Sequence, residues 1–137
     1  MWSQKEIILS PKKRGIHLIT NEILRDFPSL PEIGLLNLFI THTSAALSIN
    51  ENADPDVRID MAAILDRLVK DGEPYYLHID EGADDMSAHA RASIIGSSLT
   101  IPISKRRLNL GIWQGIYLLE FREYSSPRRI IATVTGE

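Results

Sequence analysis

The sequence predicts one compact domain of the α+β class, with a mostly antiparallel β-sheet or sandwich core and interspersed helices. Three observations support this class. Apolar runs of strand length recur along the chain, segments with helical spacing lie between them, and no composition shift, repeat or low-complexity linker divides residues 1–137. The 137 residues are enough to bury a hydrophobic core without disulfides or a structural metal.

The first third of the chain alternates strands with one helix. Residues 6–10 (EIILS) form a run typical of a strand, and residues 17–27 carry apolar side chains at helical spacing, with Thr20 as a plausible cap. Residues 35–42 (LLNLFITH) have the continuous apolar profile of a buried strand. A second strand is expected over residues 44–51.

The clearest helix signal follows. Asp54 is a good N-cap, Pro55 fits the first helical position, and Gly72 is expected to end the helix. Its expected apolar face consists of Val57, Met61, Ile64, Leu65 and Leu68.

The remaining elements are a strand, a short helix and three further strands. Residues 74–80 alternate so that Tyr76, His78 and Asp80 share a face if the segment is extended, and Ser87 is expected to cap a helix over residues 88–95. The last three strands are expected to form a β-meander. They cover residues 97–103, 111–121 and 128–136.

Composition excludes several kinds of chemistry. The chain contains no cysteine, which excludes disulfides, thiolate metal sites and cysteine nucleophiles. Its net charge of −3 does not favour nucleic acid as a partner. The apolar run within residues 1–15 is too short for a signal peptide or a membrane span, so we expect a cytoplasmic protein with no membrane partner.

Two histidines and four carboxylates lie within the twelve residues HIDEGADDMSAH. Carboxylate oxygens favour Mg²⁺, whereas imidazoles favour zinc or another transition metal. The alternative interpretation is a solvated acidic loop, in which carboxylates before a helix only favour its positive end. The six side chains are His78, Asp80, Glu81, Asp84, Asp85 and His89.

A second group of polar residues surrounds the expected strand at residues 44–51. His42 and Thr43 precede it, and Asn50 and Glu51 end it. A lone histidine after an apolar strand is more often a hydrogen-bonded structural residue, and polar side chains at a strand end need either turn hydrogen bonds or a ligand. No serine-histidine-aspartate order or nucleophile elbow accompanies them, which disfavours a hydrolase triad.

A third group combines aromatic, amide and basic side chains. Trp113 and Gln114 lie in the expected strand at 111–121, and Arg122 follows it. Trp113 can stack a heteroaromatic ring and Arg122 can bind phosphate. The structural alternatives are packing of the indole and a surface ion pair of the guanidinium.

Together these stretches resemble one family. HTSAALSINENADPDVRID, HIDEGADDMSAHARASIIGSSLTIPI and LGIWQGIYLLEFR, followed by RRIIATVTGE, are similar to the signature blocks of the YjbQ-like family, also described as secondary thiamine-phosphate synthases. The resemblance implies an α+β subunit that assembles as a homotrimer. It also implies a shared polar site that includes His42, Glu51, His78 and His89, the nearby acidic residues and Trp113-Gln114.

We therefore expect first a thiamine-phosphate synthase-like transferase that joins an aminopyrimidine methyl diphosphate to a thiazole phosphate and releases pyrophosphate. A divalent metal, Mg²⁺ or Zn²⁺, would neutralise the departing charge. We expect His42, Glu51, His78 and His89 to be catalytic and Thr43, Asn50, Trp113, Gln114 and Arg122 to contact substrate. The expected metal ligands are His42, His78, Asp80, Glu81, Asp84, Asp85 and His89.

Two alternatives remain open. One is a metal-dependent hydrolase in which His42, His78 and His89 bind the metal and Glu51 or Glu81 acts as the base. The other is a trimer that binds a metabolite or metal without catalysis. Catalytic turnover would distinguish the two enzymes from the trimer that only binds a ligand.

Overall fold

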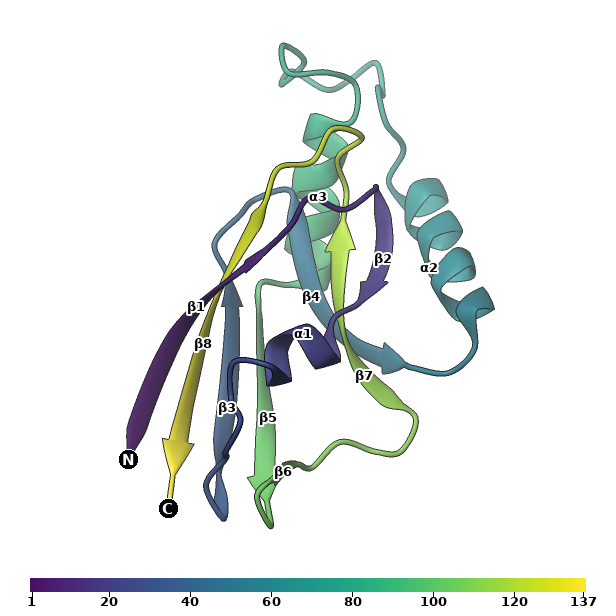
Figure 1. Ribbon diagram of the computed structural model, residues 1–137. Coiled ribbons are helices and arrows are strands. Elements are labelled where there is room, and N and C mark those ends of the chain that lie inside the picture. Colours follow the sequence, from purple (N-terminus) through teal and green to yellow (C-terminus); the bar gives the residue numbers. More distant parts are fainter.

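The computed structural model describes residues 1–137 as two antiparallel sheets and three helices (Figure 1). The larger sheet has the order β1 (Trp2–Leu9), β8 (Arg128–Gly136), β3 (Ile33–Ile40), β5 (Ser98–Ser104) and β6 (Arg107–Leu108). The smaller sheet has the order β2 (Gly15–Leu18), β7 (Gln114–Glu120) and β4 (Ala45–Glu51). The helices are α1 (Thr20–Leu24), α2 (Pro55–Leu68) and α3 (Asp85–Ile95). The α+β class with an antiparallel core is confirmed.

The main core lies between the two sheets. Strand alternation turns Leu36 and Leu38 of β3 inward from the larger sheet, and Ile116 and Leu118 of β7 inward from the smaller one. The intervening residues of β7, Tyr117 and Leu119, face the opposite side and belong to a second apolar cluster. The smaller sheet is therefore buried on both faces.

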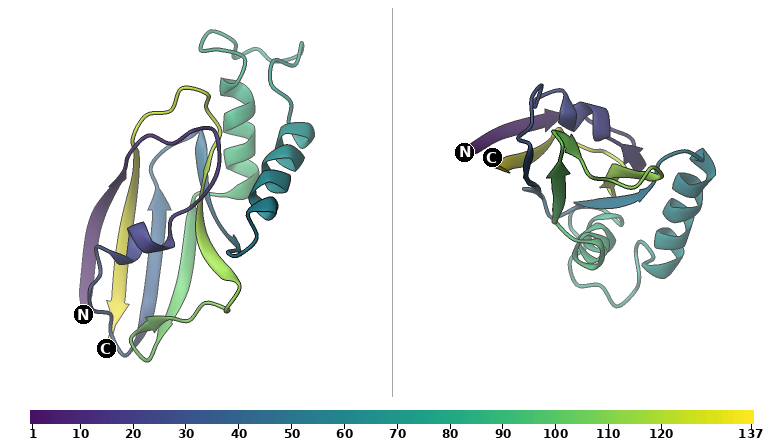
Figure 2. Two further views of the ribbon diagram at one scale, coloured as in Figure 1. Left: turned by 45° about the vertical axis from the view of Figure 1, so that its right-hand side comes forward. Right: turned by 90° about the horizontal axis from the view of Figure 1, so that it is seen from below.

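Helices α2 and α3 cover the second face of the smaller sheet (Figure 2). Leu65 of α2 and Ala88 of α3 pack with Tyr117, Leu119 and Phe121 in that cluster. The molecule thus has three layers, with the larger sheet on one side, the smaller sheet in the middle and the two long helices on the other side. Helix α3 therefore packs against β4, near the polar residues that precede this strand.

The predicted helix is confirmed as α2 together with its N-cap, but the expectation that Gly72 ends it is wrong, because the helix ends at Leu68 with Val69 as its C-cap. The Asp54 carboxylate accepts a hydrogen bond from the backbone N–H of Asp56 at 2.9 Å, and Pro55 is the first helical residue. Of the expected apolar face, Leu65 is buried, whereas Ile64 and Leu68 are exposed. This helix therefore covers the smaller sheet with only part of its apolar surface.

Most predicted strands are present, but the predicted meander is wrong. The run at 97–103 corresponds to β5, which pairs with β3, and the run at 128–136 is β8, which lies between β1 and β3. The run at 111–121 forms β7 in the other sheet, where β2 and β4 flank it. Strand pairing between distant segments decided this topology, and the apolar pattern of each run does not encode it.

Two local predictions are also wrong. Only Thr20–Leu24 of the segment 17–27 is helical, and Thr20 caps nothing because its hydroxyl accepts a hydrogen bond from the backbone N–H of Ile116 at 2.9 Å. Residues 74–80 form a loop instead of a strand. In that loop the Tyr76 N–H donates to the Glu73 carbonyl at 3.0 Å, which closes a turn.

Helix α3 begins three residues earlier than the sequence predicts, at Asp85. Ser87 lies inside the helix, where its hydroxyl donates to the carboxylate of Asp71 and contacts the Asp84 carbonyl. The earlier start brings Asp85 and His89 onto one helix at a spacing of four residues. None of the helices has the length and apolar character needed to cross a membrane.

Candidate metal centre and adjoining pocket

Three predicted metal ligands converge at the start of α3. One carboxylate oxygen of Asp85, Oδ2, lies 2.7 Å from His78 Nε2 and 3.0 Å from His89 Nε2. The three potential ligand atoms all lie within 4.8 Å of one another. Two ligand atoms about 2.1 Å from one tetrahedral ion are about 3.4 Å apart, so the contacts to Asp85 Oδ2 need to lengthen by about 0.4–0.7 Å to admit a single small cation.

The helix and the loop before it position these side chains. Asp85 and His89 occupy positions i and i+4, which bring their side chains to the same face of α3. His78 comes from the preceding loop, and its ring centroid is 5.4 Å from that of His89. Asp85 is nearly fully buried, with 2% of its side chain exposed, whereas 46% of the His78 side chain is exposed. A cation would therefore contact the buried Asp85 carboxylate on one side, and solvent would reach it past the exposed His78 side chain.

The hydrogen bonds of His89 fit either an imidazolium or a neutral ring that shares a bound cation with Asp85. Its Nδ1 lies 2.8 Å from the carbonyl oxygen of Thr43, so Nδ1 carries the proton and donates. In a neutral imidazole, the lone pair of Nε2 then faces the Asp85 carboxylate. Only an imidazolium or a shared cation makes that contact attractive, and a histidine that binds a metal through one ring nitrogen usually donates the N–H of the other to a carbonyl or carboxylate.

Arg122 fixes the acidic side of the centre. Its Nη1 donates to Asp85 Oδ1, and its Nε donates to Asp84 Oδ2 at 3.1 Å. Burial raises the pKa of Asp85, but the hydrogen bond from His78 and the charges of His89 and Arg122 outweigh it, so the pKa lies below its usual value. Asp85 is therefore ionised at neutral pH, as a metal ligand must be.

A pocket of about 490 Å³ lies beside this cluster, and both His42 and His89 line it. The His42 Nε2 accepts a hydrogen bond from the backbone N–H of Arg129 at 2.8 Å. Burial and the nearby charges of Arg128 and Arg129 lower the pKa of His42 despite the opposing effect of Glu120. The neutral ring thus keeps Nδ1 as its only N–H donor.

His42 is therefore not placed among the metal ligands, contrary to expectation, because its Nε2 is already occupied by the chain. The segment that carries this contact is anchored by a buried ion pair, in which Arg128 Nε donates to Glu120 Oε1 at 2.7 Å. Glu120 is fully buried and Arg128 is 4% exposed. Arg128 also donates to the Ser44 hydroxyl at 3.0 Å, which ties this pair to the residue two positions after His42.

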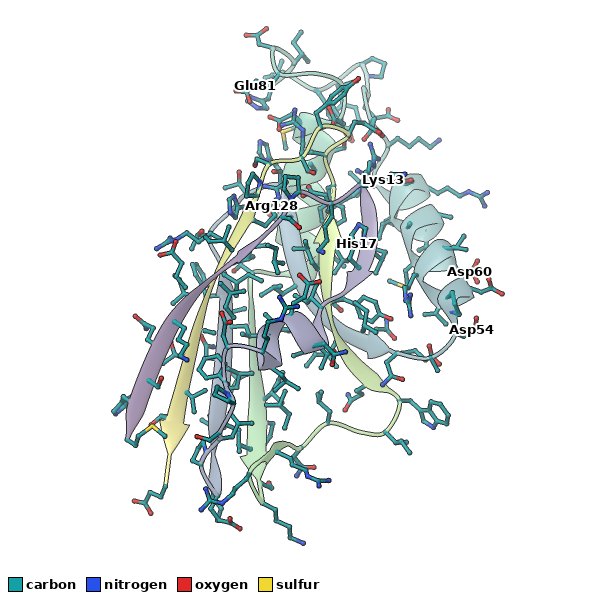
Figure 3. The ribbon with its side chains drawn as sticks, viewed as in Figure 1. Lys13, His17, Asp54, Asp60, Glu81 and Arg128 are labelled. Carbon is teal, nitrogen blue, oxygen red and sulfur yellow. The ribbon has the colours of Figure 1, made fainter.

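The other acidic residues of the loop do not join the three ligands. Glu81 lies at the tip of the loop, where its backbone carbonyl accepts a hydrogen bond from Arg122 Nη2 at 3.0 Å (Figure 3). Asp80 is exposed and forms no ion pair. Asp84 is occupied by Arg122 and by the Glu123 N–H at 2.9 Å.

Glu51 and Asn50 lie at the opposite end of β4 from His42. The two ends of this strand are about 20 Å apart, given the rise per residue of an extended chain. The Glu51 Oε2 accepts hydrogen bonds from the backbone N–H groups of Ala53 and Asp54, both at 3.0 Å. Asn50 Oδ1 accepts from the N–H of Glu51 at 2.8 Å. Within one chain these residues shape the turn before α2 and do not reach the histidines.

Trp113 and Gln114 lie at this same distant end, because Gln114 pairs with Glu51 in the sheet. Trp113 falls just outside β7 and is 61% exposed, so it is not a packed strand residue. Gln114 Oε1 accepts the N–H of Gly111 at 2.7 Å. Of the predicted substrate contacts, only Thr43 lines the pocket beside the centre.

Sequence reasoning missed five pocket residues. Ala45 lines the pocket from β4, and Ala92, Ser93, Gly96 and Ser97 line it from the end of α3 and the turn after it. Ser93 follows His89 at a spacing of four residues, so a helix that starts at Asp85 would have placed both side chains on one face. The role of the Thr43 main-chain carbonyl leaves no signal in the sequence.

Comparison with known proteins agrees with this architecture. The family described as UPF0047 protein YjbQ-like matches residues 5–137. The chain belongs to the YjbQ-like family. It is 50% identical over 139 residues to the UPF0047 protein YjbQ of Escherichia coli O157:H7, and the match covers 100% of both chains.

Solved structures of other YjbQ-like proteins share the fold. A crystal structure of a YjbQ/UPF0047 protein from Clostridium acetobutylicum superposes with a TM-score of 0.82 at 34% identity and covers 96% of this chain and 99% of that one. A protein of unknown function from Sulfolobus solfataricus P2 superposes with a TM-score of 0.84 at 24% identity, covering 100% and 99% of the two chains. The three-layer arrangement is therefore that of the YjbQ-like family.

Proposed function

We propose that the protein is a divalent-metal-dependent enzyme that acts on a phosphorylated small molecule at the His78–Asp85–His89 centre. The single observation that carries this proposal is the approach of two imidazole nitrogens to one buried carboxylate oxygen, at 2.7 Å and 3.0 Å. Two imidazoles in the donor set favour Zn²⁺ or another transition metal over Mg²⁺. Three protein ligands leave coordination positions free for water or substrate.

The reaction that we propose is a thiamine-phosphate synthase-like transfer, as the family resemblance implies. His78, Asp85 and His89 would hold the cation, which would supply positive charge to the departing pyrophosphate. The chain's own groups complete the site, since His42 offers its Nδ1–H and the pocket contains the hydroxyl-bearing residues Thr43, Ser93 and Ser97. These donors suit phosphate oxygens. Trp113 is too distant within one subunit to stack a ring bound there.

The hydrolase alternative has less support. It needs a carboxylate base near the metal, but Glu51 lies at the other end of β4 and Glu81 extends from the loop tip.

The homotrimer stays a proposal, supported by apolar side chains on the outer face of the larger sheet. Ile33, Leu35 and Phe39 of β3 are 69%, 45% and 45% exposed there. Sedimentation equilibrium tests it, and a stable monomer at micromolar concentration would refute it.

The experiment that tests the function combines metal titration with a turnover assay. Calorimetric titration of Zn²⁺ should show one site per chain in the wild type, and His78→Ala and His89→Ala should weaken binding by at least about tenfold. His17→Ala is the matched control, because His17 lies on β2 and outside the cluster (Figure 3). The metal-loaded protein should then release pyrophosphate from the aminopyrimidine diphosphate when the thiazole phosphate is present. Metal binding without pyrophosphate release would exclude the transferase and favour the binding protein.

A further inference from the structure

A pocket of about 780 Å³, here called the loop pocket, adjoins the metal centre on the side of His78. It lies between the end of α2, the loop that follows this helix and the face of α3 that carries Met86 and Ala90. Met86 and Ala90 each follow one of the helical metal ligands, Asp85 and His89, by one residue, which is about 100° around the helix. The metal centre and the loop pocket therefore occupy adjacent faces of α3, and His78 belongs to both.

The lining of the loop pocket is mainly apolar and accessible to solvent. Leu68 at the end of α2 is 65% exposed, and Tyr75 and Leu77 in the loop are 76% and 96% exposed. Leu77 directly precedes the metal ligand His78. Exposed apolar side chains that gather around one hollow mark a binding site, because each costs free energy while it faces water. The volume also lies within the range of about 300–1,000 Å³ that is typical of small-ligand pockets.

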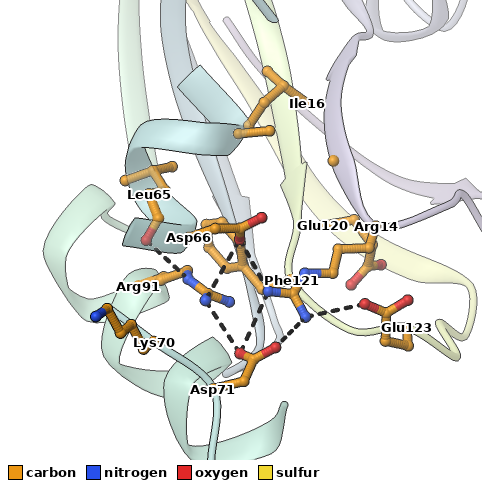
Figure 4. Close-up of a pocket in the computed structure, with 12 residues that line it drawn as sticks. Arg14, Ile16, Leu65, Asp66, Lys70, Asp71, Arg91, Glu120, Phe121 and Glu123 are labelled. Atoms are coloured by element: carbon orange, nitrogen blue, oxygen red, sulfur yellow. Dashed lines mark hydrogen bonds and ion pairs between the residues drawn. The ribbon is translucent and has the colours of Figure 1, made fainter. Parts of the chain in front are cut away.

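The loop that carries these side chains is fixed at both ends. At its start, the Asp71 carboxylate accepts hydrogen bonds from Arg14 at 2.7 Å and from Arg91 at 3.1 Å (Figure 4). At its end, Arg122 donates to the Glu81 carbonyl at 3.0 Å. The exposed apolar residues therefore lie in a segment whose two ends are held in place by the rest of the fold.

Two tyrosines form one wall of the loop pocket. The Tyr76 hydroxyl donates to the Lys70 carbonyl at 2.7 Å, and the Tyr76 N–H donates to the Glu73 carbonyl at 3.0 Å. The Tyr75 ring packs edge-to-face on the Tyr76 ring, with centroids 4.9 Å apart and planes at 78°. These contacts orient both rings before a ligand arrives, so a ligand that binds against them loses little affinity to the ordering of side chains.

The charge of the lining favours a ligand that carries phosphate. Arg67 and Lys70 line the loop pocket, are exposed and form no ion pair, whereas Glu73 is its single carboxylate. A positively charged wall beside a metal ion attracts an anionic molecule and repels a cationic one. The pocket beyond His89 instead offers hydroxyl and imidazole donors. The two sides of the metal centre are thus suited to different parts of one ligand, its phosphate and an apolar group.

We infer that the loop pocket binds the aromatic ring of the phosphorylated substrate and that Tyr75 and Leu77 determine specificity for this ring. The substrate class is then an aromatic or heteroaromatic ring joined to phosphate or diphosphate by a short linker. The inference rests on the proposed function, because the phosphate of the same molecule binds at the metal centre. The loop pocket provides a surface for a ring next to the metal, which Trp113 at the far end of β4 does not.

The test is calorimetric titration of the full chain loaded with one Zn²⁺, with benzyl phosphate and methyl phosphate as the two probes. The wild type should bind benzyl phosphate at least about tenfold more tightly, because only this probe places a ring in the loop pocket. Tyr75→Ala and Leu77→Asn should each lose most of this preference and keep the wild-type affinity for Zn²⁺ and for methyl phosphate. Both variants should fold, since both side chains are exposed.

Tyr124→Ala and Ile59→Asn are the matched controls. Tyr124 is 94% exposed, Ile59 is 65% exposed, and both lie outside the loop pocket. Both control variants should bind the two phosphates as the wild type does. Sedimentation equilibrium of Leu77→Asn tests the other possible occupant of the loop pocket, a second copy of the chain. A smaller assembly than that of the wild type would mean that a second copy covers the loop pocket and would overturn the inference.

The possible results separate this inference from the proposed function. A preference for benzyl phosphate without pyrophosphate release would support the loop pocket and overturn only the transferase. Equal affinity for the two phosphates, or a preference that persists in both Tyr75→Ala and Leu77→Asn, would overturn the inference and leave the metal centre intact. Absence of Zn²⁺ binding by the wild type would overturn both.

Discussion

Asp85 and His89 lie one turn apart on α3, and Asp85 Oδ2 is 3.0 Å from His89 Nε2 while His89 Nδ1 contacts the Thr43 carbonyl at 2.8 Å. The imidazole is thus fixed between a main-chain acceptor and a buried carboxylate. This relationship orients the ring before any ligand arrives. It is the feature from which the proposed metal chemistry follows.

Asp85→Asn should abolish tight Zn²⁺ binding and lower the free energy of unfolding at neutral pH by about 1–3 kcal/mol, because Arg122 loses its buried partner. The folded-state pKa of Asp85 lies below the ordinary value of 3.8, so the ionised carboxylate stabilises the fold above that value. This stabilisation disappears as the pH falls through the folded-state pKa. Urea unfolding from about pH 7 to about pH 2 should therefore show a constant difference between the wild type and Asp85→Asn down to about pH 4, and convergence only below it.

Asp80→Asn provides the control, since Asp80 is exposed in the same loop and forms no ion pair. Its affinity for Zn²⁺ and its unfolding curve should match those of the wild type. Equal loss of Zn²⁺ affinity in both variants would mean that the general negative charge of the loop, and not the Asp85 oxygen, holds the cation.

His42 should make the protein sensitive to pH near neutrality. Burial and the charges of Arg128 and Arg129 lower its folded-state pKa below the ordinary value of 6.5. The unfolded chain therefore binds the proton first, and stability falls as the pH drops below 6.5 towards the folded-state pKa. His42→Gln should remove this component, so thermal unfolding should show less loss between about pH 7.5 and about pH 5.5 than in the wild type. An identical pH dependence in both proteins would contradict the assignment.

Glu51→Ala should destabilise the protein without affecting metal binding. The carboxylate accepts the N–H groups of Ala53 and Asp54, as a helix-capping side chain does, so its removal should cost about 1 kcal/mol. Asp54→Ala should cost about 0.5–2 kcal/mol for the same reason. Thermal unfolding and Zn²⁺ titration measure the two effects. A Glu51→Ala variant with the wild-type melting temperature but no metal affinity would mean that Glu51 belongs to the metal centre.

Glu120→Gln should cost about 3–5 kcal/mol in urea unfolding, because it leaves Arg128 buried with an uncompensated charge. The matched surface pair is Glu6 with Arg129, at 3.0 Å and with both side chains about half exposed. Glu6→Gln should therefore cost less than about 1 kcal/mol. Similar losses in the two variants would show that burial does not set the strength of these pairs.

Local signals predicted α2 well, because Asp54 and Pro55 act through their immediate neighbours. They failed for residues 74–80, whose alternating pattern is compatible with a strand but which pair with no strand of either sheet. The position of β7 in the smaller sheet was equally hidden, since its neighbours β2 and β4 are distant in sequence. Pairing between remote segments is a property of the whole fold.

The candidate site likewise combines residues whose proximity the sequence predicts with contacts that it does not. His78, Asp85 and His89 fall within twelve residues, so their proximity could be predicted from sequence. Grouping His42 with Glu51 was less well founded, because a strand over residues 44–51 already separates its ends by about 20 Å. The contact between His89 and the Thr43 carbonyl could not be predicted, because a main-chain acceptor carries no residue signature.

The most direct test of the metal centre is an anomalous difference map from crystals grown with Zn²⁺ near neutral pH. The account predicts a peak bonded to His78 Nε2, Asp85 Oδ2 and His89 Nε2, each at about 2.0–2.2 Å, with His89 Nδ1 still donating to the Thr43 carbonyl. A map with no peak among these three atoms, or with its only peak at His17 or His42, would contradict it.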